Sequence, residues 1–198
     1  MSKTKSFDTR QMVLLALLTA IVVVLQFLGA FIRFGPFSIS LVLMPIAVGA
    51  ALIGLWAGAW LGLVFGFVVL LSGDAAVFMA IDPLGTILVV LVKGSLAGFS
   101  AGAIYKVMEK TNKTKAALSA AAVCPIVNTA VFIIGTYAFF LPTITEWAAA
   151  AGFASATAFI FIGMIGLNFI VELILNFVLS PVIIRLVQFG RDRAANAG

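Results

Sequence analysis

Residues 167–181 read LNFIVELILNFVLSP, an almost unbroken apolar run whose one charge is Glu172. Asn168 lies four residues before Glu172, and Asn176 lies four residues after it. Four helical steps advance the side-chain direction by only about 40°, so the three polar groups would share one face of a helix. Such a run predicts a membrane-spanning helix, in which a carboxylate is costly unless it meets a partner, a cavity or a ligand.

The rest of the chain is equally apolar. Of its 198 residues, 64% are hydrophobic and only 10% are charged. This composition predicts an all-α integral membrane protein, and the length suits one compact bundle that forms a single domain, 1–198. Six transmembrane helices fit the apolar runs best, over residues 11–30, 38–55, 56–71, 84–107, 116–141 and 155–186.

The basic residues predict the topology. Ten of the twelve lie in the arm 1–10, in the loop 106–115, or from Arg185 into the tail 187–198. By the positive-inside rule these three segments face the cytoplasm, which gives an N-in/C-in, multi-pass protein of the plasma membrane. Basic residues placed at the edges of spans indicate contact with the lipid bilayer and no nucleic acid partner, although the net charge is +5.

Several chemistries are missing from the sequence. There is no histidine, and Cys124 is the only cysteine, so neither a disulfide within the chain nor a cysteine–histidine metal site is expected. The pattern G-x-x-x-x-G-K-[ST] does not occur, so the chain does not hydrolyse ATP itself. We expect no enzymatic activity, no catalytic residue, no metal and no cofactor.

Polar residues on three of the predicted helices lie at similar depth. At about 1.5 Å per residue, Glu172 lies about 20 Å from Arg185, and Asn128 lies about 20 Å from Lys115. Lys93 lies about 13 Å from the outer end of its helix by the same count. This coincidence favours a solute pocket in the outer half of the membrane, completed by some of Thr129, Thr136, Tyr137 and Ser95. The alternative is a buried Lys93–Glu172 ion pair that ties the bundle together.

Arg33 is the only basic residue in a predicted outer loop. Its guanidinium is suited to a carboxylate or phosphate on a solute. Pairing with Asp74 or Asp82 in a neighbouring loop is an equal alternative.

Glycines recur every four residues in two predicted helices, at positions 54, 58, 62 and 66 and again at 94, 98 and 102. Small residues at this spacing let two helix backbones approach closely. The pattern predicts helix packing inside the bundle.

Taken together, these features resemble the substrate-binding S components of energy-coupling factor (ECF) vitamin transporters. The resemblance spans nearly the whole chain and is carried by five segments: Ala16-Leu17-Leu18-Thr19-Ala20, the glycine-rich 54–66, Asp82-Pro83-Leu84-Gly85-Thr86, Pro125-Ile126-Val127-Asn128, and 167–181. It implies a small organic vitamin bound in the outer half under the loops. It also implies that Ala16 and Ala20 face a transmembrane coupling subunit, which two ATPase subunits drive.

Departures from the sequence patterns of the family exclude some classes of solute. Nickel and cobalt members use an N-terminal Met-His, and thiamine-type members carry a site histidine, whereas this chain has neither. Pantothenate, riboflavin or a cobalamin remains, and Arg33 with Lys93 slightly favours pantothenate because it bears a carboxylate.

Two other functions fit the sequence. The first is a self-sufficient secondary transporter in which Glu172 carries a proton in exchange for solute. The second is a structural or assembly subunit without a small ligand.

Overall fold

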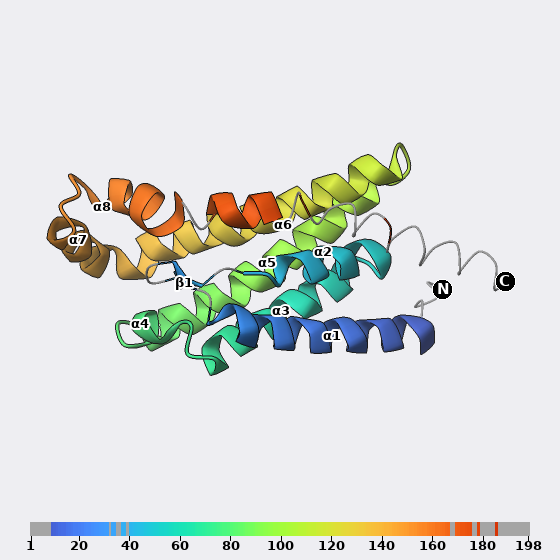
Figure 1. Cartoon of the computed structure of the whole chain (residues 1–198), viewed down its shortest axis with the longest axis horizontal. Coiled ribbons are helices and arrows are strands. Elements are labelled where there is room, and N and C mark those ends of the chain that lie inside the picture. The colour runs from blue at the N-terminus through green and yellow to red at the C-terminus, as the bar shows by residue number, and fades with distance from the viewer. Residues whose placement is uncertain are drawn as a thin grey trace, which may run out of the picture.

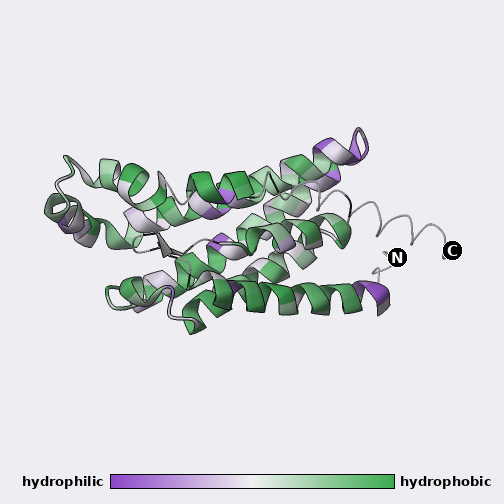
Figure 2. Ribbon diagram, in the orientation of Figure 1, coloured by the Kyte–Doolittle hydropathy of each residue, from purple (hydrophilic) through white to green (hydrophobic). Residues whose placement is uncertain are grey.

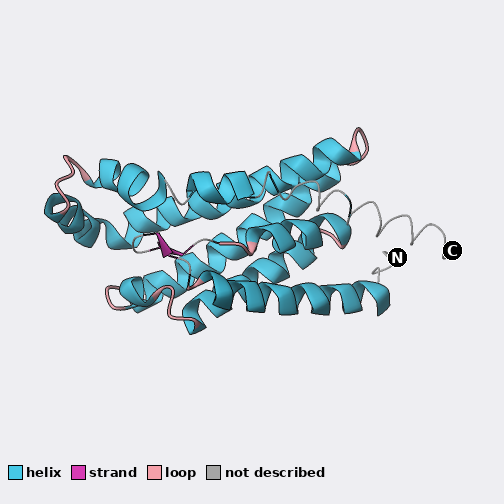
Figure 3. Ribbon diagram, viewed as in Figure 1, coloured by secondary structure: helices cyan, strands magenta, loops and turns pink. Residues whose placement is uncertain are grey.

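The computed structural model describes residues 9–31, 33–34, 37–38, 40–166, 169–175, 178 and 185. Within them the chain is helical apart from a two-stranded ribbon, in which β1 (Arg33–Phe34) pairs antiparallel with β2 (Phe37–Ser38) (Figures 1 and 3). The helices are α1 (Thr9–Gly29), α2 (Leu43–Leu52), α3 (Leu55–Leu71), α4 (Ala76–Met79), α5 (Pro83–Met108), α6 (Lys113–Gly135), α7 (Leu141–Ala150) and α8 (Ala156–Ala158). Two π-helical segments, η1 (Thr136–Phe140) and η2 (Phe159–Gly166), continue α6 and α8, and residues 169–175 are again helical.

Among the described residues, four helices are long and apolar enough to cross a membrane: Thr9–Gly29, Pro83–Met108, Lys113–Ala150 and Ala156–Leu175. Helices α2 and α3 are apolar but shorter. In Figure 2, hydrophilic residues gather at the start of α1 and at the α5–α6 turn, which lie at the same end of the molecule. The all-helical, multi-span architecture is therefore confirmed, while the number of crossing helices and the N-in/C-in orientation stay predictions.

The predicted spans differ from the structure most clearly at two places. Helix α2 starts at Leu43 and not at residue 38, because Phe37–Ser38 forms the second strand of the ribbon. Residues 142–150, expected as a loop, form the helix α7. Pro142 lies in the first turn of α7, where a missing backbone N–H leaves no helical hydrogen bond unmade.

Helices α3 and α5 pack backbone to backbone at the predicted glycines. A Cβ added at Gly62 would overlap the carbonyl oxygen of Gly94, and one added at Gly58 would overlap the carbonyl oxygen of Gly98. Only hydrogen atoms fit between the two helices at these points. The expected glycine packing is confirmed, and it brings Phe65 of α3 against α5 close to Lys93.

Buried side chains form two clusters. The larger one joins α1, α2, α3, α5 and α6, with Val22, Ile46 and Ala97 fully buried. The smaller one joins α4, η1, α7 and η2 to the adjoining part of α5, and it includes Phe78, Phe140 and Ile144. The candidate site lies where the two clusters meet, because residues of both line it.

Candidate functional site

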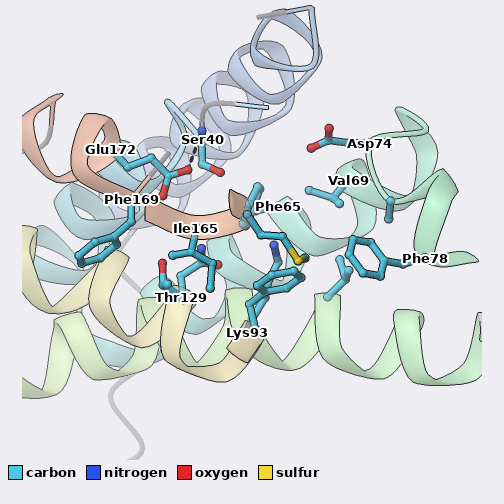
Figure 4. Close-up of a pocket in the computed structure, with 15 residues that line it drawn as sticks. Ser40, Phe65, Val69, Asp74, Phe78, Lys93, Thr129, Ile165, Phe169 and Glu172 are labelled. Atoms are coloured by element: carbon cyan, nitrogen blue, oxygen red, sulfur yellow. Dashed lines mark hydrogen bonds between the residues drawn. The ribbon is translucent and has the colours of Figure 1, made fainter. Parts of the chain in front are cut away.

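A cavity of about 80 Å³ lies between the two clusters (Figure 4). Its apolar lining contains four aromatic rings, and its polar lining combines one cation with two carboxylates. The lining residues are Phe65, Val69, Ala75, Phe78, Val90, Phe132, Met164, Ile165 and Phe169, together with Ser40, Asp74, Lys93, Asn128, Thr129 and Glu172. Apolar walls with a few placed polar groups are typical of a small-molecule site.

Lys93 reaches the cavity from α5 between two aromatic rings. Its Nζ lies 5.7 Å from the ring centroid of Phe65 and 5.5 Å from that of Phe132, within the range of cation–π attraction. Glu172 and Asp74 line the same cavity. Among the described residues, however, no carboxylate lies within ion-pair distance of Nζ. The Lys93–Glu172 ion pair considered from the sequence is therefore not formed in the described part of the chain.

Glu172 joins the last helix to the segment that follows the ribbon. Its side chain is only 3% exposed, and its Oε1 accepts a hydrogen bond of 2.9 Å from the backbone N–H of Ser40. A charge-assisted bond of this kind orients the carboxylate at the edge of the cavity. Asn168 and Asn176, the other two members of the predicted polar ladder, lie outside the described residues.

Asn128 places an amide at the cavity from α6. The residue is 5% exposed, and its Oδ1 has no hydrogen-bond partner among the described residues. Leaving a buried acceptor without a donor costs about 1–3 kcal/mol. A donor on a bound molecule would recover that cost.

The sequence analysis did not predict that Asp74 belongs to the site. Asp74, considered there only as a partner for Arg33, lines the cavity, and its Oδ2 accepts a hydrogen bond of 3.3 Å from Nε2 of Gln26. Gln26 belongs to α1 and is 1% exposed. A glutamine within a long apolar helix was the available signal, since an amide buried in a membrane needs a partner.

Other candidates lie away from the cavity. The hydroxyls of Thr136 and Ser95 donate to the carbonyls of Phe132 and Leu91 in their own helices, and Tyr137 pairs with Thr157 at 2.8 Å. Of the four residues suggested to complete a pocket, only Thr129 lines it.

Asp82, the second loop residue considered as a partner for Arg33, has a structural role in the described part of the chain. Asp82 caps α5, because its Oδ1 accepts from the N–H of Gly85 at 3.0 Å. Arg33 itself is described only through its backbone in β1, opposite Ser38.

Ala16 and Ala20 are both exposed on the outer surface of α1. Between them, the Thr19 hydroxyl donates to the carbonyl of Leu15 and accepts a hydrogen bond of 3.3 Å from Nε1 of Trp60. The two alanines therefore lie on the exposed face of α1, and the half-exposed indole of Trp60 lies next to Thr19.

Comparison with known proteins is consistent with this arrangement. The family described as "ECF transporter, substrate-specific component" matches residues 10–184. No curated protein sequence matches the chain. Among solved structures, ThiT from Listeria monocytogenes superposes with a TM-score of 0.64 at 23% identity, over 91% of this chain and 99% of that chain. At that identity the likeness establishes a shared fold.

Proposed function

The chain belongs to the family of substrate-specific components of ECF transporters, and we propose that it is the high-affinity, solute-binding membrane subunit of an ATP-driven importer for a small organic vitamin. Members of this family are membrane subunits that bind vitamin-type substrates. The observation that carries the proposal is the cavity at which Lys93, Asn128 and Glu172 come together from three separate helices. Three polar groups that converge among aromatic walls, two of them buried and the third half-buried, favour a ligand over simple bundle packing.

The cavity is too small to hold a vitamin unless it opens. Pockets for drug-sized ligands measure about 300–1,000 Å³, well above the 80 Å³ found here. Ser40 follows the ribbon, and Asp74 and Phe78 lie in or next to α4, so two interhelical connections border the cavity. We propose that these connections move apart to admit solute and close over it.

Energy would come from other subunits. The whole chain forms one membrane domain in this proposal, with six crossing helices, both termini in the cytoplasm, and the plasma membrane as its location. Ala16 and Ala20, exposed on α1, would contact the transmembrane coupling subunit, which two ATPase subunits drive. Small residues at that spacing suit close helix–helix contact.

The identity of the vitamin is open to direct test. The preference for pantothenate depended on Arg33 and Lys93, and the described cavity also contains the carboxylates of Glu172 and Asp74. Pantothenate, riboflavin and a cobalamin are therefore compared in one assay. Native mass spectrometry of the purified chain should detect a bound small molecule of vitamin size.

Transport distinguishes the proposal from its rival. Liposomes that contain the chain with coupling and ATPase subunits should accumulate the identified vitamin only when ATP is supplied, and the chain alone should bind it without accumulating it. Uptake by the chain alone under a pH gradient, abolished in Glu172→Gln, would instead establish a proton-coupled secondary transporter.

A further inference from the structure

We propose that the solute is a nitrogen heterocycle that presents an N–H donor and a hydrogen-bond acceptor side by side along one edge. The N–H donates to Oδ1 of Asn128, and the acceptor receives a hydrogen bond from the ammonium of Lys93. The inference rests on the proposed function, because it takes the cavity as the solute site. It goes further by naming the hydrogen-bonding pattern of the solute.

Asn128 supplies an acceptor that needs a donor. The residue lines the cavity from α6 and is 5% exposed. Its Oδ1 is buried and has no hydrogen-bond partner among the described residues. A buried acceptor is costly when no donor reaches it, and the lining around it is largely apolar. A solute that places a donor at this point recovers the cost.

Lys93 supplies donors that need an acceptor. Its Nζ lies over the rings of Phe65 and Phe132, at 5.7 and 5.5 Å from their centroids. Ring faces attract the positive charge, but they do not accept its three N–H bonds as a carbonyl oxygen or a ring nitrogen does. In the described part of the chain, Nζ makes no hydrogen bond and no ion pair. A solute acceptor in front of Nζ therefore adds a charge-assisted hydrogen bond.

The donor and the acceptor of the protein lie at the same part of the cavity. Phe132 follows Asn128 by four residues on α6, so the two side chains share one helix face. Because Nζ of Lys93 lies over the Phe132 ring, the ammonium is only about one helical turn, ~6 Å, from the level of Asn128. Figure 4 shows Lys93 on the same side of the pocket as Thr129, the residue that follows Asn128. One end of a solute therefore meets both groups.

This arrangement selects a ring over an open chain. In an open-chain secondary amide, such as that of pantothenate, the trans bond points the N–H and the C=O to opposite sides, so one amide cannot meet Lys93 and Asn128 together. A ring holds the two groups on the same edge, as in a cyclic amide or an aminopyrimidine. Four phenylalanine rings line the cavity, and flat heterocycles pack well against such walls. The inferred solute is thus a planar heterocycle with a donor–acceptor edge.

A panel of vitamins separates solutes that have the edge from those that lack it. Binding to the purified full-length chain is measured by equilibrium dialysis and thermal stabilisation. Riboflavin, folate and thiamine present an N–H beside an acceptor on a ring, whereas pantothenate, nicotinate and cobalamin lack such a ring edge. We expect one of the first three to bind at least tenfold more tightly than each of the last three. Strongest binding by pantothenate, nicotinate or cobalamin, or no binding by any edge-bearing vitamin, overturns the inference.

A matched analogue of the vitamin that binds tests the contact with Asn128. The analogue lacks the edge N–H: riboflavin or folate carries a methyl group on that nitrogen, and thiamine carries hydrogen in place of its amino group. The wild type should bind the analogue at least tenfold less tightly, and this difference should disappear in Asn128→Leu. Leucine occupies at least as much space as asparagine, so a purely steric penalty would persist. Equal affinities in the wild type, or a difference that persists in Asn128→Leu, refute the contact.

The variant Lys93→Met tests the second contact. Methionine still packs against Phe65 and Phe132 but has no N–H to donate. The affinity for the vitamin should fall at least tenfold, while its ratio to the affinity for the analogue stays as in the wild type, because Asn128 is intact. Lys106→Met makes the same substitution at an exposed position of α5 outside the cavity and should change neither value. Affinities come from complete saturation curves, so unfolded protein in the sample does not lower them, and an unchanged affinity in Lys93→Met excludes its role.

Failure of this inference is separable from failure of the proposed function. If the chain imports pantothenate or cobalamin with ATP and coupling subunits, the importer stands and the donor–acceptor edge is wrong. If an edge-bearing vitamin binds through Asn128 and Lys93 but no ATP-driven uptake occurs, the edge stands and the importer role is wrong.

Discussion

Replacing Gly62 with alanine tests whether the α3–α5 contact positions the site. The added methyl group would overlap the carbonyl oxygen and carbon of Gly94 and would meet the backbone nitrogen of Ser95 at 3.0 Å. All the obstructing atoms are backbone, so no side chain can rotate away. The helices must separate or slide, and Lys93 precedes Gly94 directly in the sequence.

The expected loss of stability follows from overpacking. Forcing an extra methyl group into a close-packed contact costs about 1–3 kcal/mol. For a chain of this length, each kcal/mol lowers the melting temperature by about 2–4 °C, so a loss of ~2 kcal/mol corresponds to about 4–8 °C. Moving α5 also displaces Lys93 from the rings of Phe65 and Phe132, so solute affinity should fall as well.

Thermal unfolding in detergent, followed by size-exclusion chromatography, measures the first effect, and solute titration measures the second. Two variants on the same helix act as controls. Gly66→Ala places its methyl group 2.9 Å from the carbonyl oxygen of Val90 and should cost less. Phe67→Leu, at a side chain that is 50% exposed on the surface, should cost least. If Gly62→Ala unfolds at the same temperature as Phe67→Leu and binds solute equally well, the close glycine contact does not position the site.

Three further outcomes are expected. Ala16→Trp should block ATP-driven uptake in liposomes while leaving solute affinity unchanged, because residue 16 is exposed on α1 away from the cavity; intact uptake would refute the coupling role. Asn128→Leu should weaken solute binding by about tenfold, which corresponds to a loss of ~1.4 kcal/mol. Its melting temperature should stay equal or rise, because the substitution removes a buried acceptor without a partner in the described structure. A large fall in melting temperature would mark Asn128 as structural. Gln26→Leu should weaken solute binding several-fold, because it removes the hydrogen bond that holds Asp74. Gln26→Glu should weaken binding more, through repulsion between two carboxylates. Equal affinities of the wild type and both variants would exclude Gln26 as a positioning residue.

Local patterns in the sequence predict much of this protein. Apolar runs indicate where helices form, because each stretch must satisfy its own backbone hydrogen bonds in the membrane. Depth counting along single helices was enough to place Lys93, Asn128 and Glu172 at a common level, and all three line one cavity. The glycine repeats predicted close helix packing, since their four-residue spacing is a property of one helix at a time.

The contacts made by these residues depend on tertiary structure. Asp74 and Ser40 lie in connections, where no periodicity indicates the direction of a side chain. Contacts distant in sequence hold them at the cavity: Gln26 of α1 donates to Asp74, and Ser40 donates to Glu172 of the last helix. The sequence left open whether Lys93 pairs with Glu172, and the fold instead places Lys93 between two phenylalanine rings from α3 and α6. Helix formation and depth follow from interactions within a few residues, so the sequence by itself determined where most helices form and the shared depth of Lys93, Asn128 and Glu172. Partner choice depends on residues far apart in the chain, and only the packing of helices and connections decided it.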